Sequence, residues 1–246
     1  MKLLILSALL TALTLSSFAA DGKPVTYKSG DETVNAILYT PQGKGPFPAL
    51  VVIHEWWGLN DWVKEQASKL ADQGYVALAI DLYRGKVATT ADEAHEIMRG
   101  VPNDRANRDL LAASSFLRSQ SNVNPAKVGD IGWCMGGGYA LDLAIADPKL
   151  KAAVINYGHL ASDQATLQKI HAAILGIFGG QDHGIPVADV KKFESDLKAQ
   201  GKTVEIKIFP DAGHAFENPN NKQGYRADDA KQAWELTTSF LAKYLK

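Results

Sequence analysis

Short runs of apolar, often β-branched residues alternate along this chain with longer stretches whose apolar positions recur at helical spacing. Residues 49–53, ALVVI, form a run of five apolar residues, which is typical of a strand buried on both faces. Residues 61–73 repeat apolar positions every three or four residues, which predicts an amphipathic helix, and Gly74 is suited to end it. The alternation predicts an α/β fold, with a mostly parallel sheet covered by helices on both faces.

The same pattern continues to the end of the chain without a repeat, a low-complexity tract or a linker. We therefore expect one domain over residues 20–246. Further strands are expected at 25–27, 33–39, 75–80, 127–131, 152–155, 172–178 and 203–209, and further helices near 91–98 and at 103–119, 139–146, 186–200 and 228–245.

The first nineteen residues have the pattern of a secretory signal peptide. Lys2 supplies a positive charge, residues 3–15 are apolar apart from three hydroxyl residues, and Ser17 and Ala19 offer small side chains for cleavage after Ala19. The apolar run is too short for an ordinary membrane-spanning helix, although an uncleaved anchor remains the alternative. We expect a periplasmic or secreted protein without stable membrane insertion.

Composition and charge narrow the class of partner. The chain has 246 residues, 46% of them hydrophobic, and a formal net charge of −1. That charge does not favour a nucleic-acid partner, which would require a basic face. The chain shows no coiled-coil pattern, and we expect a monomer that acts on a small molecule.

The only cysteine, Cys134, lies at the centre of the segment Gly132-Trp133-Cys134-Met135-Gly136-Gly137. Glycines on both sides of a nucleophile, between a strand and a helix, are typical of the nucleophile turn of α/β-hydrolases. The helix that follows would direct its N-terminal N–H groups at the thiol and favour the thiolate. A single cysteine in an exported protein cannot pair within the chain, which indicates either a reactive thiol or intermolecular pairing.

Two further residues follow predicted strands in the order that this fold requires, namely nucleophile, acid and base. Asp182 comes after Gly179-Gly180-Gln181, and His214 follows Gly213 ahead of the last helix. We predict a Cys134–His214–Asp182 triad at the carboxyl edge of the sheet. In this hypothesis His214 accepts the thiol proton, Asp182 orients the imidazole, and Cys134 forms a thioester that water then hydrolyses.

The loop after the strand 49–53 holds the sequence His54-Glu55-Trp56-Trp57-Gly58. An oxyanion hole in this fold takes one backbone N–H from the residue after the nucleophile and another from this loop. We therefore predict Met135 and Trp56 as the two donors. His54 is expected to shape the loop by hydrogen bonding.

Together these segments, with Asp81-Leu82-Tyr83 and Gly213-His214-Ala215-Phe216, resemble the dienelactone hydrolase family of α/β-hydrolases. The resemblance implies hydrolysis of carboxylic esters or lactones by a Cys-His-Asp triad without a cofactor. It also implies that Glu55 lies beside the thiol and takes part in activating it when substrate arrives.

Two departures from the family pattern concern the substrate. Members that cleave dienelactone have an arginine four residues after the catalytic histidine, where this chain has Asn218, and a second arginine two residues after Asp-Leu-Tyr, where it has Gly85. Arg84 lies one position earlier and is a candidate for substrate binding. An anionic substrate depends on such arginines, and we therefore expect a neutral ester or lactone. Aromatic residues near the predicted site are further substrate-binding candidates: Tyr83, Trp57, Tyr157 and Phe216.

Two other functions remain open on the sequence alone. One is a non-catalytic ligand-binding protein on the same fold, and the other is a thiol-sensing protein that uses Cys134. The histidines lack the spacing of metal ligands, and no metal site is expected.

Overall fold

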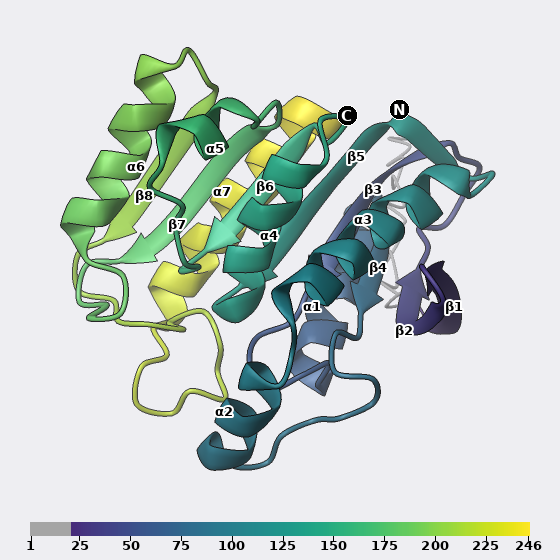
Figure 1. The fold of residues 1–246 in the computed structure, drawn as a ribbon, viewed down its shortest axis with the longest axis horizontal. Coiled ribbons are helices and arrows are strands. Elements are labelled where there is room, and N and C mark those ends of the chain that lie inside the picture. Colours follow the sequence, from purple (N-terminus) through teal and green to yellow (C-terminus); the bar gives the residue numbers. More distant parts are fainter. Residues whose placement is uncertain (1–20) are drawn as a thin grey trace, which may run out of the picture.

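The computed structural model describes residues 21–246, and the predicted signal peptide lies outside these residues. The order of elements is the expected alternation of strands and helices (Figure 1). The strands are β1 (Lys23–Ser29), β2 (Glu32–Tyr39), β3 (Phe47–Ile53), β4 (Val76–Ile80), β5 (Val123–Trp133), β6 (Ala152–Asn156), β7 (Ala173–Gly179) and β8 (Val204–Phe209). The helices are α1 (Asp61–Asp72), α2 (Ala91–Arg99), α3 (Asn103–Ser119), α4 (Met135–Ala146), α5 (Gln164–Gln168), α6 (Val187–Ala199) and α7 (Ala227–Leu245).

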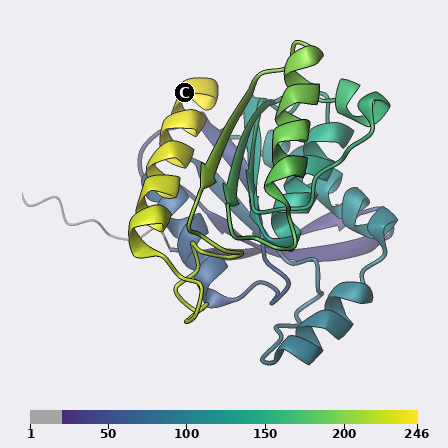
Figure 2. The same cartoon turned by 90° about the vertical axis from the view of Figure 1, so that its left-hand side faces the viewer.

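The eight strands form one sheet in the order β1-β2-β4-β3-β5-β6-β7-β8. β2 pairs antiparallel with both β1 and β4, and every other pairing is parallel. α1 and α7 cover one face, while α3, α4 and α6 cover the other, as the two perpendicular views show (Figures 1 and 2). The predicted mostly parallel sheet with two helical layers is confirmed.

The core lies along the central strands. Every residue of β4, β6 and β7 is buried, as are the last five of β3, because helices cover both faces of these strands. Each fully buried side chain of Leu or Val size contributes about 1.5–3 kcal/mol. The edge strand β8 is mostly half-buried, and the edge strand β1 is partly exposed. The rigid centre of the sheet therefore carries the strand ends on which the predicted site depends.

Three elements differ from the expectation. β5 begins four residues early, because Val123 pairs with Phe47 ahead of a register shift in β3. α4 begins at Met135, directly after the nucleophile turn. The short helix α5 was missed because it has five mostly polar residues; Asp163 caps it, since its side chain accepts a hydrogen bond from the Thr166 N–H at 2.8 Å.

Candidate active site

Cys134 lies between β5 and α4 in a backbone conformation that residues other than glycine rarely adopt, with φ 56° and ψ −119°. The turn closes because glycines allow backbone to approach backbone. A side chain on Gly132 would overlap the carbonyl group of Gly136, and one on Gly136 would overlap the carbonyl oxygens of Ile53 and His54. The Cys134 N–H donates to the Asn156 carbonyl at 3.0 Å. The turn presents the half-buried thiol at the start of α4.

The loops after β7 and β8 bring Asp182 and His214 together. His214 Nδ1 lies 2.6 Å from Asp182 Oδ2. The other Asp182 oxygen accepts from the N–H groups of Gly184 at 2.9 Å and Ile185 at 3.3 Å. Burial raises the pKa of Asp182, but the hydrogen bond from His214 and these backbone bonds outweigh it and hold the pKa below its usual value.

Cys134 also acts on His214, because its thiol is one of the groups that raise the pKa of the imidazole. Burial lowers this pKa, but the interactions with Asp182 and Cys134 outweigh it and raise the pKa to about 10. The imidazole is therefore a strong acceptor for the thiol proton. The structure brings together the three residues that the sequence predicts.

Glu55 follows β3, the neighbour of β5 in the sheet, and is 1% exposed. Its Oε2 accepts a hydrogen bond from Asn218 Nδ2 at 2.6 Å. Burial raises the pKa of Glu55 to about 7, although Asn218 and His214 both act to lower it. Asn218 stands where the family has an arginine. It therefore gives Glu55 a hydrogen bond from a neutral amide in place of a positive charge.

The loop that carries Glu55 and Trp56 is held in place by hydrogen bonds of two buried side chains, His54 and Tyr83. The His54 ring lies with Nδ1 2.6 Å from the Glu55 carbonyl, and its Nε2 accepts from the Leu82 N–H at 3.2 Å, so that Nδ1 carries the ring proton. The Tyr83 hydroxyl donates to the Trp56 carbonyl at 3.0 Å. The expected role of His54 is confirmed. Tyr83, predicted to bind substrate, is corrected: it is buried, does not line the cleft and supports this loop instead.

A cleft of about 1610 Å³ opens over the thiol. Trp56, Trp57 and Met135 line it beside Cys134 and His214, and residues of α2 and of the loop between β8 and α7 form its outer wall. Figure 1 shows α2 and this loop at the same end of the molecule. Trp57 therefore lines the cleft beside the thiol, and its contact with a substrate stays a prediction.

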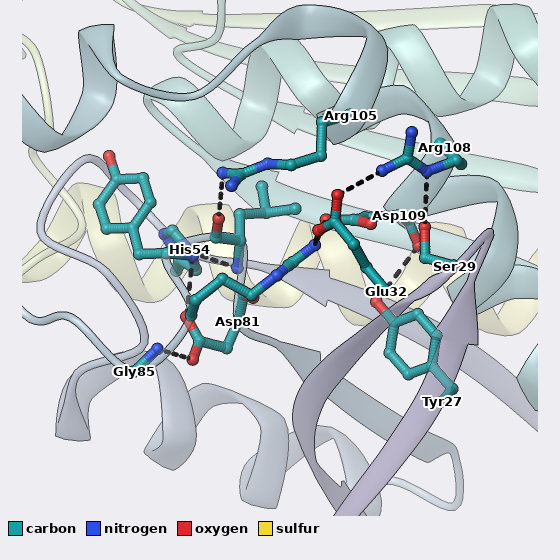
Figure 3. A network of polar contacts seen from close by, with 12 residues as sticks. Tyr27, Ser29, Glu32, His54, Asp81, Gly85, Arg105, Arg108 and Asp109 are labelled. Atoms are coloured by element: carbon teal, nitrogen blue, oxygen red, sulfur yellow. Dashed lines mark hydrogen bonds and ion pairs between the residues drawn. The ribbon is translucent and has the colours of Figure 1, made fainter.

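Arg84 does not line this cleft, which corrects its prediction as a substrate-binding residue. Its backbone takes the left-handed conformation, with φ 56°, and its guanidinium pairs with Asp109 and Glu32, both at 2.7 Å. Figure 3 shows the surrounding network, in which Arg108 also reaches Glu32. Asp109 is fully buried in α3, and Arg84 supplies the countercharge that such a carboxylate requires.

Tyr157 and Phe216 are also corrected, because both are fully buried and lie behind the His214 imidazole rather than in the cleft wall. The Tyr157 ring packs edge-on against His214, with centroids 5.3 Å apart, and against Phe216 at 5.6 Å. These aromatic rings fix the position of the imidazole. Among the described residues no group of three or more histidine, cysteine or acidic side chains could hold a metal ion.

The sequence did not predict the contact of Glu217 behind this site. Glu217, next to Asn218, accepts a hydrogen bond from the buried Trp133 indole at 3.3 Å. The only signal available was its position three residues after His214, and an acidic residue there reads equally well as a surface loop residue. No helix among residues 21–246 combines the length and the apolar character needed to cross a membrane.

Comparison with known proteins agrees with this geometry. The model of the dienelactone hydrolase family matches residues 34–245. Two proteins named "Putative carboxymethylenebutenolidase" are each 32% identical: the one from Methylorubrum extorquens matches 87% of this chain and 78% of its own, and the one from Aquifex aeolicus matches 92% and 100%.

Solved structures show the same likeness. A dienelactone hydrolase-like promiscuous phosphotriesterase from metagenomic libraries superposes with a TM-score of 0.85 at 26% identity, over 93% of this chain and 100% of its own. A dienelactone hydrolase from Anabaena variabilis shares the fold at a TM-score of 0.70 and 22% identity, over 93% and 100%.

Proposed function

We propose, from the premise that this chain belongs to the dienelactone hydrolase family of α/β-hydrolases, that it cleaves carboxylic esters or lactones through a thioester on Cys134. One observation carries the proposal. The chain's single cysteine occupies the strained turn before α4, and its thiol acts on His214, whose imidazole lies 2.6 Å from Asp182.

The reaction divides into two acyl transfers. The Cys134 sulfur attacks the acyl carbon while the thiol proton passes to His214, and the carbonyl oxygen becomes an oxyanion. When the tetrahedral intermediate collapses, the C–O bond breaks and the leaving alkoxide takes the proton from His214. Water then attacks the thioester with His214 as base, and the acid and the free thiol are released.

The remaining groups stabilise charge along this path. The backbone N–H groups of Met135, at the first position of α4, and of Trp56 are the proposed donors to the oxyanion. Loss of one such donor typically costs about 3–4 kcal/mol in the transition state. Glu55, buried beside the thiol, supports its activation in the ionised form.

We propose a neutral, bulky ester or lactone as the substrate. Arg84 is paired with Asp109 and Glu32, and Asn218 stands where the family has an arginine four residues after the histidine. The bidentate recognition of a substrate carboxylate therefore lacks its usual groups. The cleft of about 1610 Å³ is larger than most small-molecule sites, and Trp56 and Trp57 offer aromatic surface to an acyl group. The predicted signal peptide supports action in the periplasm or outside the cell.

The test compares hydrolysis of neutral p-nitrophenyl esters with that of a cis-dienelactone, using the mature protein and Cys134→Ala. We expect turnover of neutral esters, weak turnover of the anionic lactone, and neither in the variant. A folded protein that turns over no ester or lactone would contradict the proposal and favour a ligand-binding or thiol-sensing role.

A further inference from the structure

Two consecutive carbonyl groups in the loop after β3 accept hydrogen bonds from buried side chains. The Glu55 carbonyl lies 2.6 Å from His54 Nδ1, which carries the ring proton. The Trp56 carbonyl accepts from the Tyr83 hydroxyl at 3.0 Å. Both side chains are buried, and neither of them lines the substrate cleft. They therefore act on the loop from the interior of the protein.

These contacts fix the direction in which the Trp56 N–H points. In a trans peptide the carbonyl of one residue and the N–H of the next point in opposite directions across one rigid plane. The peptide between Glu55 and Trp56 is trans, and its carbonyl points toward His54 and also accepts from the Gly58 N–H at 3.2 Å. The Trp56 N–H therefore points away from His54, and no acceptor for it lies among residues 21–246. It is a free donor in a residue that lines the cleft beside Cys134.

The same phenol also contacts the residue that carries the second proposed donor. The Tyr83 oxygen lies 3.2 Å from Met135 Sδ. Met135 is the first residue of α4, where a helix N–H has no intrahelical acceptor. One phenolic oxygen thus touches both Trp56 and Met135, and it holds the two sides of the proposed oxyanion hole next to each other.

We propose that His54 and Tyr83 are positioning residues of the oxyanion hole, which hold the peptides on both sides of Trp56 so that its N–H meets the developing oxyanion; this inference rests on the ester hydrolysis proposed above. The hydrogen bond from His54 also polarises the peptide and strengthens its N–H as a donor. A donor that is already in place needs no reorganisation when the oxyanion forms, and this preorganisation lowers the barrier.

The surroundings of His54 keep it in one state. Its Nε2 accepts from the Leu82 N–H at 3.2 Å, which excludes the other neutral tautomer. Burial lowers the pKa of the imidazole, although the Glu55 carbonyl and the charge of Asp81 act to raise it, and the ring is therefore neutral at pH 7. Leu82 lies between Asp81 and Tyr83, so that one segment after β4 supports both positioning side chains (Figure 3).

The experiment measures kcat and kcat/KM of four variants of the mature protein on a neutral p-nitrophenyl ester. His54→Leu removes the hydrogen bond to the Glu55 carbonyl, whereas the amide NH₂ group in His54→Asn takes the place of Nδ1 and keeps it. Tyr83→Phe removes only the hydroxyl. Tyr75→Phe is the matched control, because Tyr75, just before β4, is also buried and its hydroxyl has no partner among residues 21–246.

We expect kcat and kcat/KM to fall by the same factor, because the lost interaction is made only in the transition state. The factor should be about 10² in His54→Leu and about ten in Tyr83→Phe. His54→Asn should recover most of the loss, and Tyr75→Phe should match the wild type. Equal losses in His54→Asn and His54→Leu would overturn the role of His54, and an unchanged kcat in Tyr83→Phe would overturn that of Tyr83.

A second readout separates the oxyanion hole from the thiol. When the Cys134 sulfur adds to the carbonyl carbon of a trifluoromethyl ketone, the thiol proton passes to His214 and the ketone oxygen becomes an oxyanion, so that the affinity of the ketone reports on the hole. Alkylation by iodoacetamide forms the S–C bond as iodide leaves and develops no oxyanion. We expect ketone affinity to fall by the same factors as kcat/KM while the alkylation rate stays unchanged. An alkylation rate that falls in parallel would overturn the proposal, because the substitutions would then act through the thiol.

Failure of this inference is distinct from failure of ester hydrolysis. A folded wild type that neither hydrolyses an ester nor binds the ketone would overturn both. An active wild type whose ketone affinity is unchanged in His54→Leu and Tyr83→Phe would overturn this inference alone. If His54→Leu does not fold, the comparison of Tyr83→Phe with Tyr75→Phe gives the answer.

Discussion

Two carboxyl groups interact with His214, and their surroundings give them opposite properties. The two oxygens of Asp182 have three polar contacts, with His214, Gly184 and Ile185, and its pKa is held below the usual value despite burial. Glu55 has one hydrogen bond, from Asn218, and burial raises its pKa to about 7. Hydrogen bonding rather than depth decides which carboxyl stays charged.

The difference suits two different tasks. In the proposed mechanism Asp182 must remain ionised to hold the His214 tautomer and to stabilise the imidazolium throughout the reaction. The pKa of Glu55 lies close to physiological pH, and such a carboxyl can change its charge in response to a substrate. Each of the following experiments tests one side of this comparison.

The largest effect is expected for Asp182→Asn, which keeps the shape of the side chain and removes its charge. We predict a fall in kcat of about 10⁴-fold, because the imidazole then adopts the wrong tautomer. Steady-state kinetics on a neutral ester measures it. Asp211→Asn, at an exposed position in the loop after β8 that carries His214, should retain activity, and equal losses in both variants would contradict the assignment.

Arg84→Ala separates a structural arginine from a substrate-binding one. Removal of the guanidinium leaves the buried Asp109 unpaired, and we predict a loss of about 3–5 kcal/mol in the free energy of unfolding. Urea denaturation measures it, with Arg108→Ala as a control, because Arg108 pairs only with the more exposed Glu32. The KM of the folded variant should stay unchanged. A raised KM with unchanged stability would show that Arg84 binds substrate.

Glu55→Gln should lower activity while raising stability. We predict a fall in kcat of about 10²-fold, typical of losing a proton-transfer group. The native pKa of Glu55, about 7, lies above the ordinary value of 4.5, and the native state therefore binds more protons than the unfolded state between these pH values. Stability of the wild type consequently falls as pH rises through this window.

Glu55→Gln has no carboxyl group at this position, and its stability therefore lacks this dependence on pH. It should be more stable than the wild type by up to about 3 kcal/mol at pH 8, and the difference should shrink toward pH 4.5. Thermal unfolding across this range measures it. A variant that is destabilised equally at both ends would show that Glu55 is a structural carboxylate.

The sequence predicts those parts of the molecule that depend on local chemistry. The apolar runs of β3 and β4 mark buried strands, and the glycines around Cys134 mark the turn, because both follow from steric and hydrophobic rules within a few residues. The order of Cys134, Asp182 and His214 was enough to predict the triad that the structure brings together.

Side-chain orientations that depend on residues far away in the sequence could not be predicted in the same way. Arg84 turns away from the cleft because Asp109 lies buried in α3, twenty-five residues on in the sequence. A buried acidic residue between Ala106 and Leu110 on the apolar face of that helix was the one available signal. Tyr157 and Phe216 were placed near the site correctly, but whether a ring faces substrate or supports the imidazole depends on packing between loops.

The most direct measurement of the central claim is mass spectrometry of the protein quenched in acid during turnover of a p-nitrophenyl ester. The account predicts an added acyl mass on the peptide that carries Cys134, formed at the rate of the nitrophenol burst and lost, together with turnover, in Cys134→Ala. Turnover that persists in Cys134→Ala, or an acyl group found on another residue, would contradict it.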